Sequence, residues 1–260
     1  MGELPVKLFM RNFNISETDT RECELKGSKF IESRLDFDPS LMKNRFGTTI
    51  LQSYLQSWRY FYPHGDKVIR SIYTIPKEIA EKADKFVTNI REQLPSPDYV
   101  LVGLHVRLGD KINNPQNKNY YDQWALSNDY YNRAIHLLQQ RHQNLAFIVF
   151  TGGAVSSAAM ESDRQWTATH FGEVSNHTFF DTSNDPYESL HALSACDAIV
   201  LGHSSFSWWA AYLSHSREVI APYHMFTKEL EEERHYVAED YYLPGWSLLA
   251  KDKKDDRILQ

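Results

Sequence analysis

The segment over residues 99–110, YVLVGLHVRLGD, constrains the fold more than any other part of the chain. Its first half is a nearly unbroken apolar run, which is typical of a strand that helices cover on both faces of a parallel sheet. The segment then carries His105, Arg107 and Asp110. Charged groups at the carboxyl end of a buried strand are costly without a partner, and open α/β sheets bind ligands at that edge. Two interpretations fit: a ligand site, or an ion pair of Arg107 with Asp110 or a distant carboxylate that closes the strand.

Apolar runs and helical periodicities alternate after this segment. Further strands are expected over 145–150, 178–181, 198–201 and 218–221. Helices are expected over 128–142, 154–170, 185–196 and 206–213. Strands separated by single helices pair in parallel with right-handed connections. The pattern therefore predicts an α/β fold with a Rossmann-like parallel sheet.

The flanking regions show less regular patterns. A short strand is expected over 6–10, and apolar residues spaced three and four apart predict amphipathic helices over 48–61 and 76–94. Helix and coil are expected after residue 226, and the last ten residues are expected to form a solvated tail. The predicted parts are a partly helical N-terminal region (1–97), a Rossmann-like ligand-binding domain (98–226) and a C-terminal helix and tail (227–260).

Composition excludes some classes of function. The net charge of −6 gives no sign of a nucleic-acid-binding protein. The cysteines, Cys23 and Cys196, cannot build a disulfide framework, and whether they pair stays open. Sequons at Asn14 and Asn176 would carry glycans only in a secretory compartment. No apolar run long enough to cross a membrane is found, and the first residues do not have the pattern of a signal peptide.

The segment Gly202-His203-Ser204-Ser205-Phe206 joins an expected strand to an expected helix. Its serines can cap that helix, and a helix start is also a ready anion site. Capping alone would explain the serines. Because Arg107 is expected at the carboxyl end of a strand in the same sheet, the combination of guanidinium, helix start and hydroxyls looks like a diphosphate site. No metal-ligand spacing is evident, so no metal is expected.

Two aromatic groups could serve either packing or binding. In the polar loop over 111–123 and just after it, Tyr120, Tyr121 and Trp124 would either line a pocket or pin the loop by packing. Trp208 and Trp209 are adjacent on an expected helix and point about 100° apart. They cannot both face one ligand, so we expect them to be structural; one indole stacking on a sugar is the alternative.

The motifs together resemble those of the α-1,2-fucosyltransferase family, glycosyltransferase family 11. HVRLGD at 105–110 is similar to the H-x-R-R-x-D motif shared by several fucosyltransferase families, and SACDAIVLGHSSFSWWAAYL at 194–213 is similar to the second signature of this family. LQSYLQSWRYF at 51–61 is also similar to the aromatic helix that precedes the first motif in this family.

The resemblance implies a GT-B-like fold whose Rossmann-like half, 98–226, binds a GDP-sugar, with a shortened N-terminal part. It implies transfer of L-fucose from GDP-fucose, with inversion, to the 2-hydroxyl of a galactose-terminated glycan acceptor. GDP-fucose is a substrate, so no cofactor is implied. Family members are typically glycoproteins of the Golgi membrane, acting in protein glycosylation, held there by an anchor that this chain does not show. No acceptor glycan or oligomeric state is indicated.

The resemblance also assigns residues. Arg107 matches the arginine expected on the β-phosphate of the donor, and His105 and Asp110 match the flanking motif positions. This implies a catalytic group of Arg107, Asp110 and His105 and a donor-binding group of His105, Arg107, Glu188, Ser204, Ser205 and Phe206. The acceptor hydroxyl needs a base or a proton acceptor, and Asp110, His105 and Glu188 all remain candidates.

The sequence departs from the family pattern in several places. The second motif arginine is Leu108, and the usual acidic residue before the serines is Ser189, with Glu188 beside it. The glycine-rich motif G-x-G-N-Q does not occur in the sequence. These departures leave an alternative open, in which the chain is a non-catalytic, degenerate relative that binds a GDP-sugar.

Overall fold

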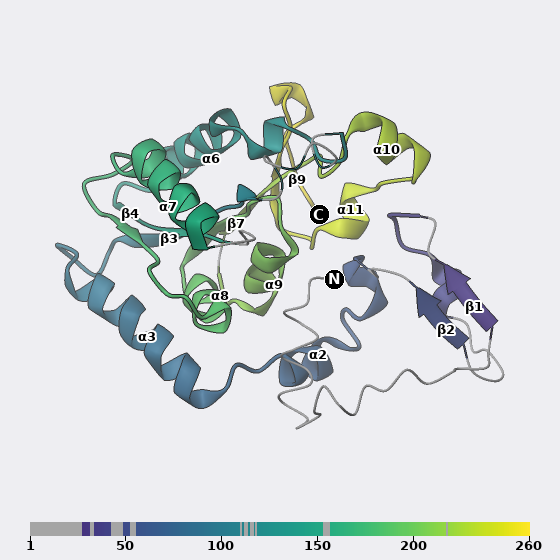
Figure 1. Ribbon diagram of the computed structural model, residues 1–260, viewed down its shortest axis with the longest axis horizontal. Helices are drawn as coiled ribbons and strands as arrows, with labels where there is room; N and C mark the ends of the chain where they lie inside the picture. Colours follow the sequence, from purple (N-terminus) through teal and green to yellow (C-terminus); the bar gives the residue numbers. More distant parts are fainter. Residues whose placement is uncertain are drawn as a thin grey trace. The chain divides into compact units, whose positions relative to one another are not determined.

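The structure is a computed structural model that describes residues 28–31, 34–42, 49–52, 56–109, 111, 114, 117, 119–152, 157–216 and 218–260. The chain forms two compact units. The first contains Met1–Thr74 and Lys228–Pro244, and the second contains Ile75–Thr227 and Gly245–Gln260. Figure 1 shows the elements of both units in their sequence colours. The boundaries expected from the sequence, at 97/98 and 226/227, stay a prediction.

The second unit is built on a seven-stranded sheet with the order β5-β4-β3-β6-β7-β8-β9. Every neighbouring pair is parallel except β8 and β9. The first six strands therefore have the 3-2-1-4-5-6 order of a Rossmann fold, which confirms the Rossmann-like parallel sheet expected from the sequence. The strands are β3 (Val100–Val106), β4 (Leu145–Thr151), β5 (Thr178–Phe180), β6 (Ala198–Val200), β7 (Glu218–Pro222), β8 (Ser247–Leu249) and β9 (Arg257–Ile258).

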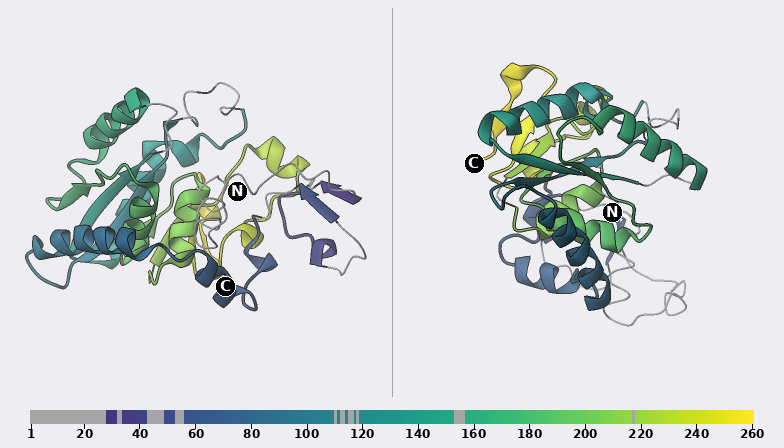
Figure 2. Two further views of the ribbon diagram at one scale, coloured as in Figure 1. Left: turned by 60° about the horizontal axis from the view of Figure 1, so that its bottom comes forward. Right: turned by 90° about the vertical axis from the view of Figure 1, so that its left-hand side faces the viewer.

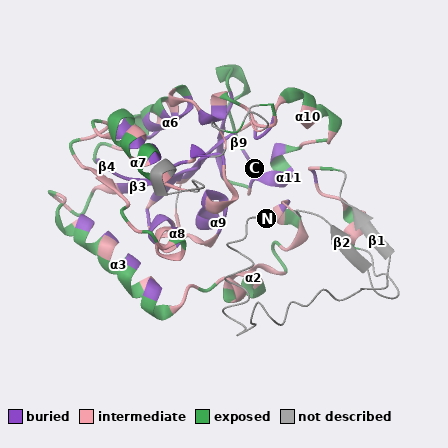
Figure 3. Cartoon of the chain, viewed as in Figure 1, coloured by how far each residue is buried: buried purple, intermediate pink, exposed green. Residues whose placement is uncertain are grey.

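Helices cover both faces of this sheet, as the right-hand view of Figure 2 shows. One face carries α6 (Asn128–Arg141) and α7 (Ser157–Phe171); the other carries α3 (Lys77–Glu92), α8 (Pro186–Ser194) and α9 (Ser205–Leu213). Because both faces are covered, β3 and β4 are buried almost throughout, which explains their continuous apolar sequence (Figure 3). Asp185 caps the start of α8, as the sequence predicts: its side chain accepts the Tyr187 N–H, and Pro186 lies in the first turn.

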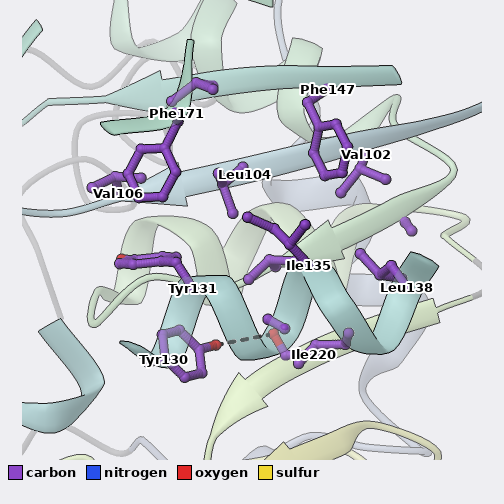
Figure 4. Packing of buried hydrophobic residues seen from close by; sticks show 14 of the residues in the cluster. Val102, Leu104, Val106, Tyr130, Tyr131, Ile135, Leu138, Phe147, Phe171 and Ile220 are labelled. Atoms are coloured by element: carbon purple, nitrogen blue, oxygen red, sulfur yellow. Dashed lines mark hydrogen bonds between the residues drawn. The ribbon is translucent and has the colours of Figure 1, made fainter. Parts of the chain in front are cut away.

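The core between α6 and the sheet includes two fully buried tyrosines (Figure 4). The Tyr130 hydroxyl donates to the Leu201 carbonyl at 2.8 Å, and the Tyr131 hydroxyl donates to the His105 carbonyl at 3.1 Å. Buried phenols need such partners. The acceptors lie at the carboxyl ends of β3 and β6, so α6 fixes the two strand ends on which the candidate site is built.

The first unit contains a parallel pair of strands, β1 (Ser28–Ile31) and β2 (Thr49–Gln52). Its helices are α2 (Asp66–Ile72), α10 (Lys228–Glu233) and α11 (Ala238–Tyr241), with 3₁₀ turns η2 (Pro39–Met42) and η3 (Trp58–Tyr60). Arg59 pairs with Asp240 at 2.7 Å, and the Trp58 indole donates to the Glu239 carbonyl at 2.8 Å. These contacts join segments that are far apart in sequence.

Two expectations are corrected by the structure. The helix expected over 48–61 is wrong, because Thr49–Gln52 forms β2 and Trp58–Tyr60 forms a 3₁₀ turn. Its apolar run is short and includes β-branched residues, and pairing with β1 decides for a strand. The solvated tail expected over residues 251–260 is correct for exposure, since every side chain there except Leu259 is exposed, but β9 pairs with β8 and the Leu259 side chain is buried. The strand expected over 6–10 lies outside the described residues.

Candidate functional site

The order in which the chain adds strands to the sheet reverses between the neighbouring strands β3 and β6. After β3 the strands run outward through β4 to β5, whereas after β6 they run the other way through β7 to β8. Such a topological switch point is where open α/β sheets bind ligands, beyond the carboxyl ends of the two central strands. Residues 105–109 follow or end β3, and residues 202–206 follow β6. Both sequence motifs therefore meet at this one place.

The end of β3 is held by its neighbours. The Arg107 side chain is half-buried, and its Nη1 donates to the carbonyl of Gly152 at the end of β4, at 3.1 Å. Gly109 has φ of 37°, a conformation that suits glycine, and its N–H donates to buried Asp163 of α7 at 3.1 Å. The sheet and α7 thus fix the backbone from which Arg107 projects.

His105 lies inside this edge, with 3% of its surface exposed. Its ring lies 5.2 Å from the Phe206 ring, and its Nδ1 has no hydrogen-bond partner. Burial, helped by the charge of Arg107, lowers the pKa of His105 to about 3, so the ring is neutral at pH 7. A side chain at Gly202 would lie 2.4 Å from the His105 carbonyl, so this close approach of β3 and the β6 end requires glycine.

The start of α9 faces the same edge. Ser204 is the N-cap, and its Oγ accepts the Phe206 N–H at 3.2 Å, while Ser205 is the first helical residue. The first-turn N–H groups of a helix carry partial positive charge and favour anions. Trp208 and Trp209, on the same helix, are buried at 6% and 8% exposure, which fits the structural role expected for them.

A cluster of aromatic side chains lies beside the helix start. Tyr121 forms a β-bridge with Phe226, and their rings stack at 6.0 Å. The buried His203 ring lies edge-on to Tyr121 at 4.8 Å. The Lys111 ammonium lies 3.3 Å from the centre of the Tyr121 ring. The loop containing Tyr121 is therefore pinned by aromatic packing, one of the two roles left open by the sequence.

His203 is almost fully buried, and neither ring nitrogen makes a well-aligned hydrogen bond. Burial, with the charge of Lys111 adding to it, lowers the pKa of His203 to about 3, against the opposing effect of backbone carbonyls at Met225 and at His203 itself. Both histidines at the switch point are thus neutral rings. Any positive charge at this edge comes from arginine, lysine and the helix start.

One carboxyl group was missed by the sequence analysis. Asp181 follows β5 and is mostly buried; its Oδ2 accepts the Ser189 hydroxyl at 2.5 Å. Burial raises the pKa of Asp181; hydrogen bonds from Ser189 and Ser183 oppose this shift, and the charge of neighbouring Glu188 adds to it. A shifted carboxyl at a strand's carboxyl end is a candidate functional group. The signal was present, since the expected third strand, TFFD, ends in this residue.

The candidate residues fall into groups. His105, Arg107, Ser204, Ser205 and Phe206 follow or end the two strands of the switch point. Glu188 lies on α8, next to Asp181 rather than on either of those strands. Asn176 precedes β5 at the opposite edge of the sheet. Asp110 and Asn14 lie outside the described residues, as does Cys23, whereas Cys196 is a buried free thiol.

In the part of the chain that the structure describes, no three His, Cys, Asp or Glu side chains are grouped as metal ligands. Among the same residues, no helix combines the length and the apolar character needed to span a membrane.

Comparison with known proteins gives a family match. The model of Glycosyl transferase family 11 matches residues 44–250. The O-antigen biosynthesis glycosyltransferase WbnK of Escherichia coli is 24% identical over 63% of this chain and 50% of its own length. An alpha-1,2-colitosyltransferase of Escherichia coli is 27% identical over 64% of this chain and 52% of its own length. Galactoside alpha-(1,2)-fucosyltransferase 1 of Alouatta belzebul is 27% identical over 73% of this chain and 49% of its own length.

The chain thus spans about half the length of the curated relatives it matches. Among solved structures, that of POFUT1 in complex with GDP is 14% identical over 66% of this chain and 55% of its own, with a TM-score of 0.38. A similarity this low does not establish a shared arrangement of the two chains.

Proposed function

We propose, because the chain belongs to glycosyltransferase family 11, that it is an inverting fucosyltransferase that moves L-fucose from GDP-fucose to the 2-hydroxyl of a galactoside in a glycan. One observation carries the proposal: Arg107 after β3 and the Ser204–Phe206 start of α9 after β6 meet at the switch point of a Rossmann-like sheet. That combination suits a diphosphate. The fucosyl and colitosyl relatives support a 1,2-linkage.

The donor side of the reaction needs stabilisation of a leaving group. When the bond between fucose and GDP breaks, negative charge grows on the β-phosphate. The planar fork of Arg107 and the first-turn N–H groups of α9 would stabilise that charge, and each preorganised donor contributes about 3–4 kcal/mol in well-studied enzymes. His105 is neutral and buried, so we assign it to holding this edge and to hydrogen bonding with the donor.

The acceptor side needs a group that takes the hydroxyl proton. With a pKa of about 3, His105 is a weak base at pH 7, which leaves the carboxylates Asp110 and Glu188. Between these we favour Asp110, because it closes the motif that carries Arg107. Substitution Asp110→Asn should abolish transfer while GDP affinity stays within about threefold, because an amide keeps the shape and loses the basicity. Equal loss of transfer and of GDP binding would instead make Asp110 a donor ligand.

The relatives differ in their donor sugar and in their cellular setting. The donor sugar is fucose in one relative and colitose in another, so both donors belong in the assay. The Golgi location and glycosylation at Asn14 and Asn176 remain expectations from animal members of the family. Two of the proteins similar to this chain come from Escherichia coli, which has no Golgi, so similarity to this family does not imply a Golgi location.

The test is turnover of GDP-fucose with a β-galactoside acceptor. We expect GDP release coupled to a fucosylated product, unchanged by EDTA, and lost in Arg107→Ala. Restoration of EDTA-inhibited transfer by Mn²⁺ or Mg²⁺ would contradict the charge-stabilising role given to Arg107. Tight GDP binding without transfer to any galactoside would favour the alternative, a non-catalytic GDP-sugar-binding protein.

A further inference from the structure

A second cation lies at the same edge of the sheet as Arg107. Lys111 follows the turn after β3, and its N–H donates to the Leu108 carbonyl at 2.9 Å. Its ammonium lies 3.3 Å from the centre of the Tyr121 ring. An aromatic face attracts a cation electrostatically, so this contact holds the charge in a defined place. The sequence motif assigned no role to this lysine.

The two cations lie on opposite sides of β3. Arg107 donates to Gly152, at the end of β4. Lys111 lies over Tyr121, whose ring contacts His203, at the end of β6. In the sheet, β3 lies between β4 and β6. Arg107 and Lys111 therefore flank the switch point, with Lys111 on the side from which α9 begins.

The surroundings of Lys111 hold its side chain in place. Tyr121 is bridged to Phe226, and the Asp122 N–H and Thr227 N–H bonds extend this pairing on either side. His203 is buried and neutral, so it adds no positive charge of its own beside α9. Leu108, between the two cations in sequence, is buried in the hydrophobic core and cannot supply a charge at this edge.

The geometry points to Lys111 as a second phosphate-binding residue, held by Tyr121 beside the start of α9, so that the site takes a diphosphate rather than a monophosphate. This inference rests on the proposed function and extends it. One guanidinium forks onto one phosphate, whereas a diphosphate spreads its charge over both. An ammonium on the α9 side completes a cradle with charge on each flank of β3.

The experiment is calorimetric titration of the full chain with GDP and with GMP. Lys111→Met removes the charge, Lys111→Arg keeps it, and Tyr121→Leu removes the ring beneath it. Lys85→Met is the matched control, because Lys85 is an exposed lysine of α3. Melting temperatures measured alongside identify any variant that has lost its fold.

We expect Lys111→Met to weaken GDP binding about tenfold or more, the size of a hydrogen bond to a charged group, and to change GMP binding far less. Lys111→Arg should retain most GDP affinity, and Tyr121→Leu should lose part of it. Lys85→Met should match the wild type. The dependence of GDP affinity on salt should weaken in Lys111→Met only.

Three results would overturn the inference, and they are distinguishable. If Lys111→Met binds GDP as tightly as Lys85→Met while Arg107→Ala binds weakly, Lys111 is not a phosphate ligand and the proposed function stands. If the wild-type chain binds neither GDP nor GMP, the proposed function fails together with the inference. Equal weakening of GDP and GMP in Lys111→Met would also overturn it, since selectivity for the diphosphate would then have another source.

Discussion

The two edges of the central sheet handle polar groups in different ways. At the amino edge, Asp197 lies just before β6. Its carboxylate accepts hydrogen bonds from Nη1 and Nη2 of Arg91, each at 3.0 Å, and from the Leu101 N–H at 2.9 Å. Glu218, at the start of β7, pairs with Arg141 and lies 2.8 Å from His142. At the carboxyl edge, by contrast, Nδ1 of His105 is buried without a hydrogen-bond partner, and the buried ring nitrogens of His203 make no well-aligned hydrogen bond.

The contrast separates structural charges from functional ones. Ion pairs that close a strand end, as at the amino edge, satisfy each other and leave little for a ligand. Buried polar atoms without partners are costly, and they persist where function requires them. The carboxyl edge combines such atoms with a glycine that admits close backbone approach and with a capped helix start. Arg107 belongs to this second environment.

The largest expected effect tests whether α9 is held by packing rather than by a ligand. Trp208→Ala and Trp209→Ala should each lower the free energy of unfolding by about 3–5 kcal/mol, because large side chains are removed from a core. GDP affinity should fall with the melting temperature, measured by calorimetry on the same samples. An unchanged melting temperature with a raised acceptor KM would instead make that indole a sugar platform.

A matched pair of arginine variants compares the two edges directly. Arg107→Lys keeps the charge and loses the fork, and should weaken GDP binding by roughly 2 kcal/mol, about thirtyfold. Arg91→Lys makes the same change at the amino edge. It should leave GDP affinity unchanged and alter stability by less than about 1 kcal/mol, because that pair is partly exposed. Equal GDP affinity in both variants would remove the distinction between the edges.

The neutral histidines predict a loss of stability in acid. The unfolded chain protonates them below about pH 6.5, but burial holds both pKa values in the folded protein at about 3. Their contribution to the free energy of unfolding is therefore present above about pH 6.5 and is lost as the pH falls from 6.5 to 3. The loss is about 2 kcal/mol per histidine from pH 7 to pH 5. In urea titrations, His203→Gln should lose about 2 kcal/mol less than the wild type over that range. Identical pH dependence would show that His203 is not buried as a neutral ring.

The smallest effect concerns two aspartates that each accept a backbone N–H from the ends of the same strand. Asp163 holds Gly109 after β3, and Asp197 holds Leu101 at its start. Asp163→Ala and Asp197→Ala should each lose about 1–2 kcal/mol of stability by leaving a buried partner unsatisfied. Only Asp163→Ala should also raise the donor KM, and Asp163→Asn, which keeps an acceptor oxygen, should restore it. Parallel effects on KM would mean that the turn does not position Arg107.

Much of the sheet unit could be predicted from the sequence. Strands buried on both faces leave continuous apolar runs, and the residues of β3 and β4 carry that signal clearly. Caps at Asp185 and Ser204 were readable because they depend on local chemistry. The strands β2 and β8 were missed because each is short and gains its stability from pairing with a strand distant in sequence, and β9 was missed because only Arg257 and Ile258 form it, paired with the preceding strand β8.

The candidate site was predicted only in part. Arg107 and Ser204–Phe206 follow strands, so topology alone placed them at one edge. The roles of Lys111 and Asp181 could not be predicted, because their positions depend on contacts with Tyr121 and Ser189 that no local sequence pattern encodes. Burial also changes the chemistry of a side chain: the sequence made His105 a candidate base, and desolvation lowers its pKa so that it is a weak one.

Amide hydrogen exchange with and without GDP tests the central claim most directly, since the claim concerns backbone N–H groups at one sheet edge. GDP should slow exchange at Ser205, Phe206 and the turn around Gly109, and should leave Leu101 and Ala198 at the amino edge unchanged. GDP binding that protects other segments, with no change at the start of α9, would contradict the assignment of the carboxyl edge as the donor site.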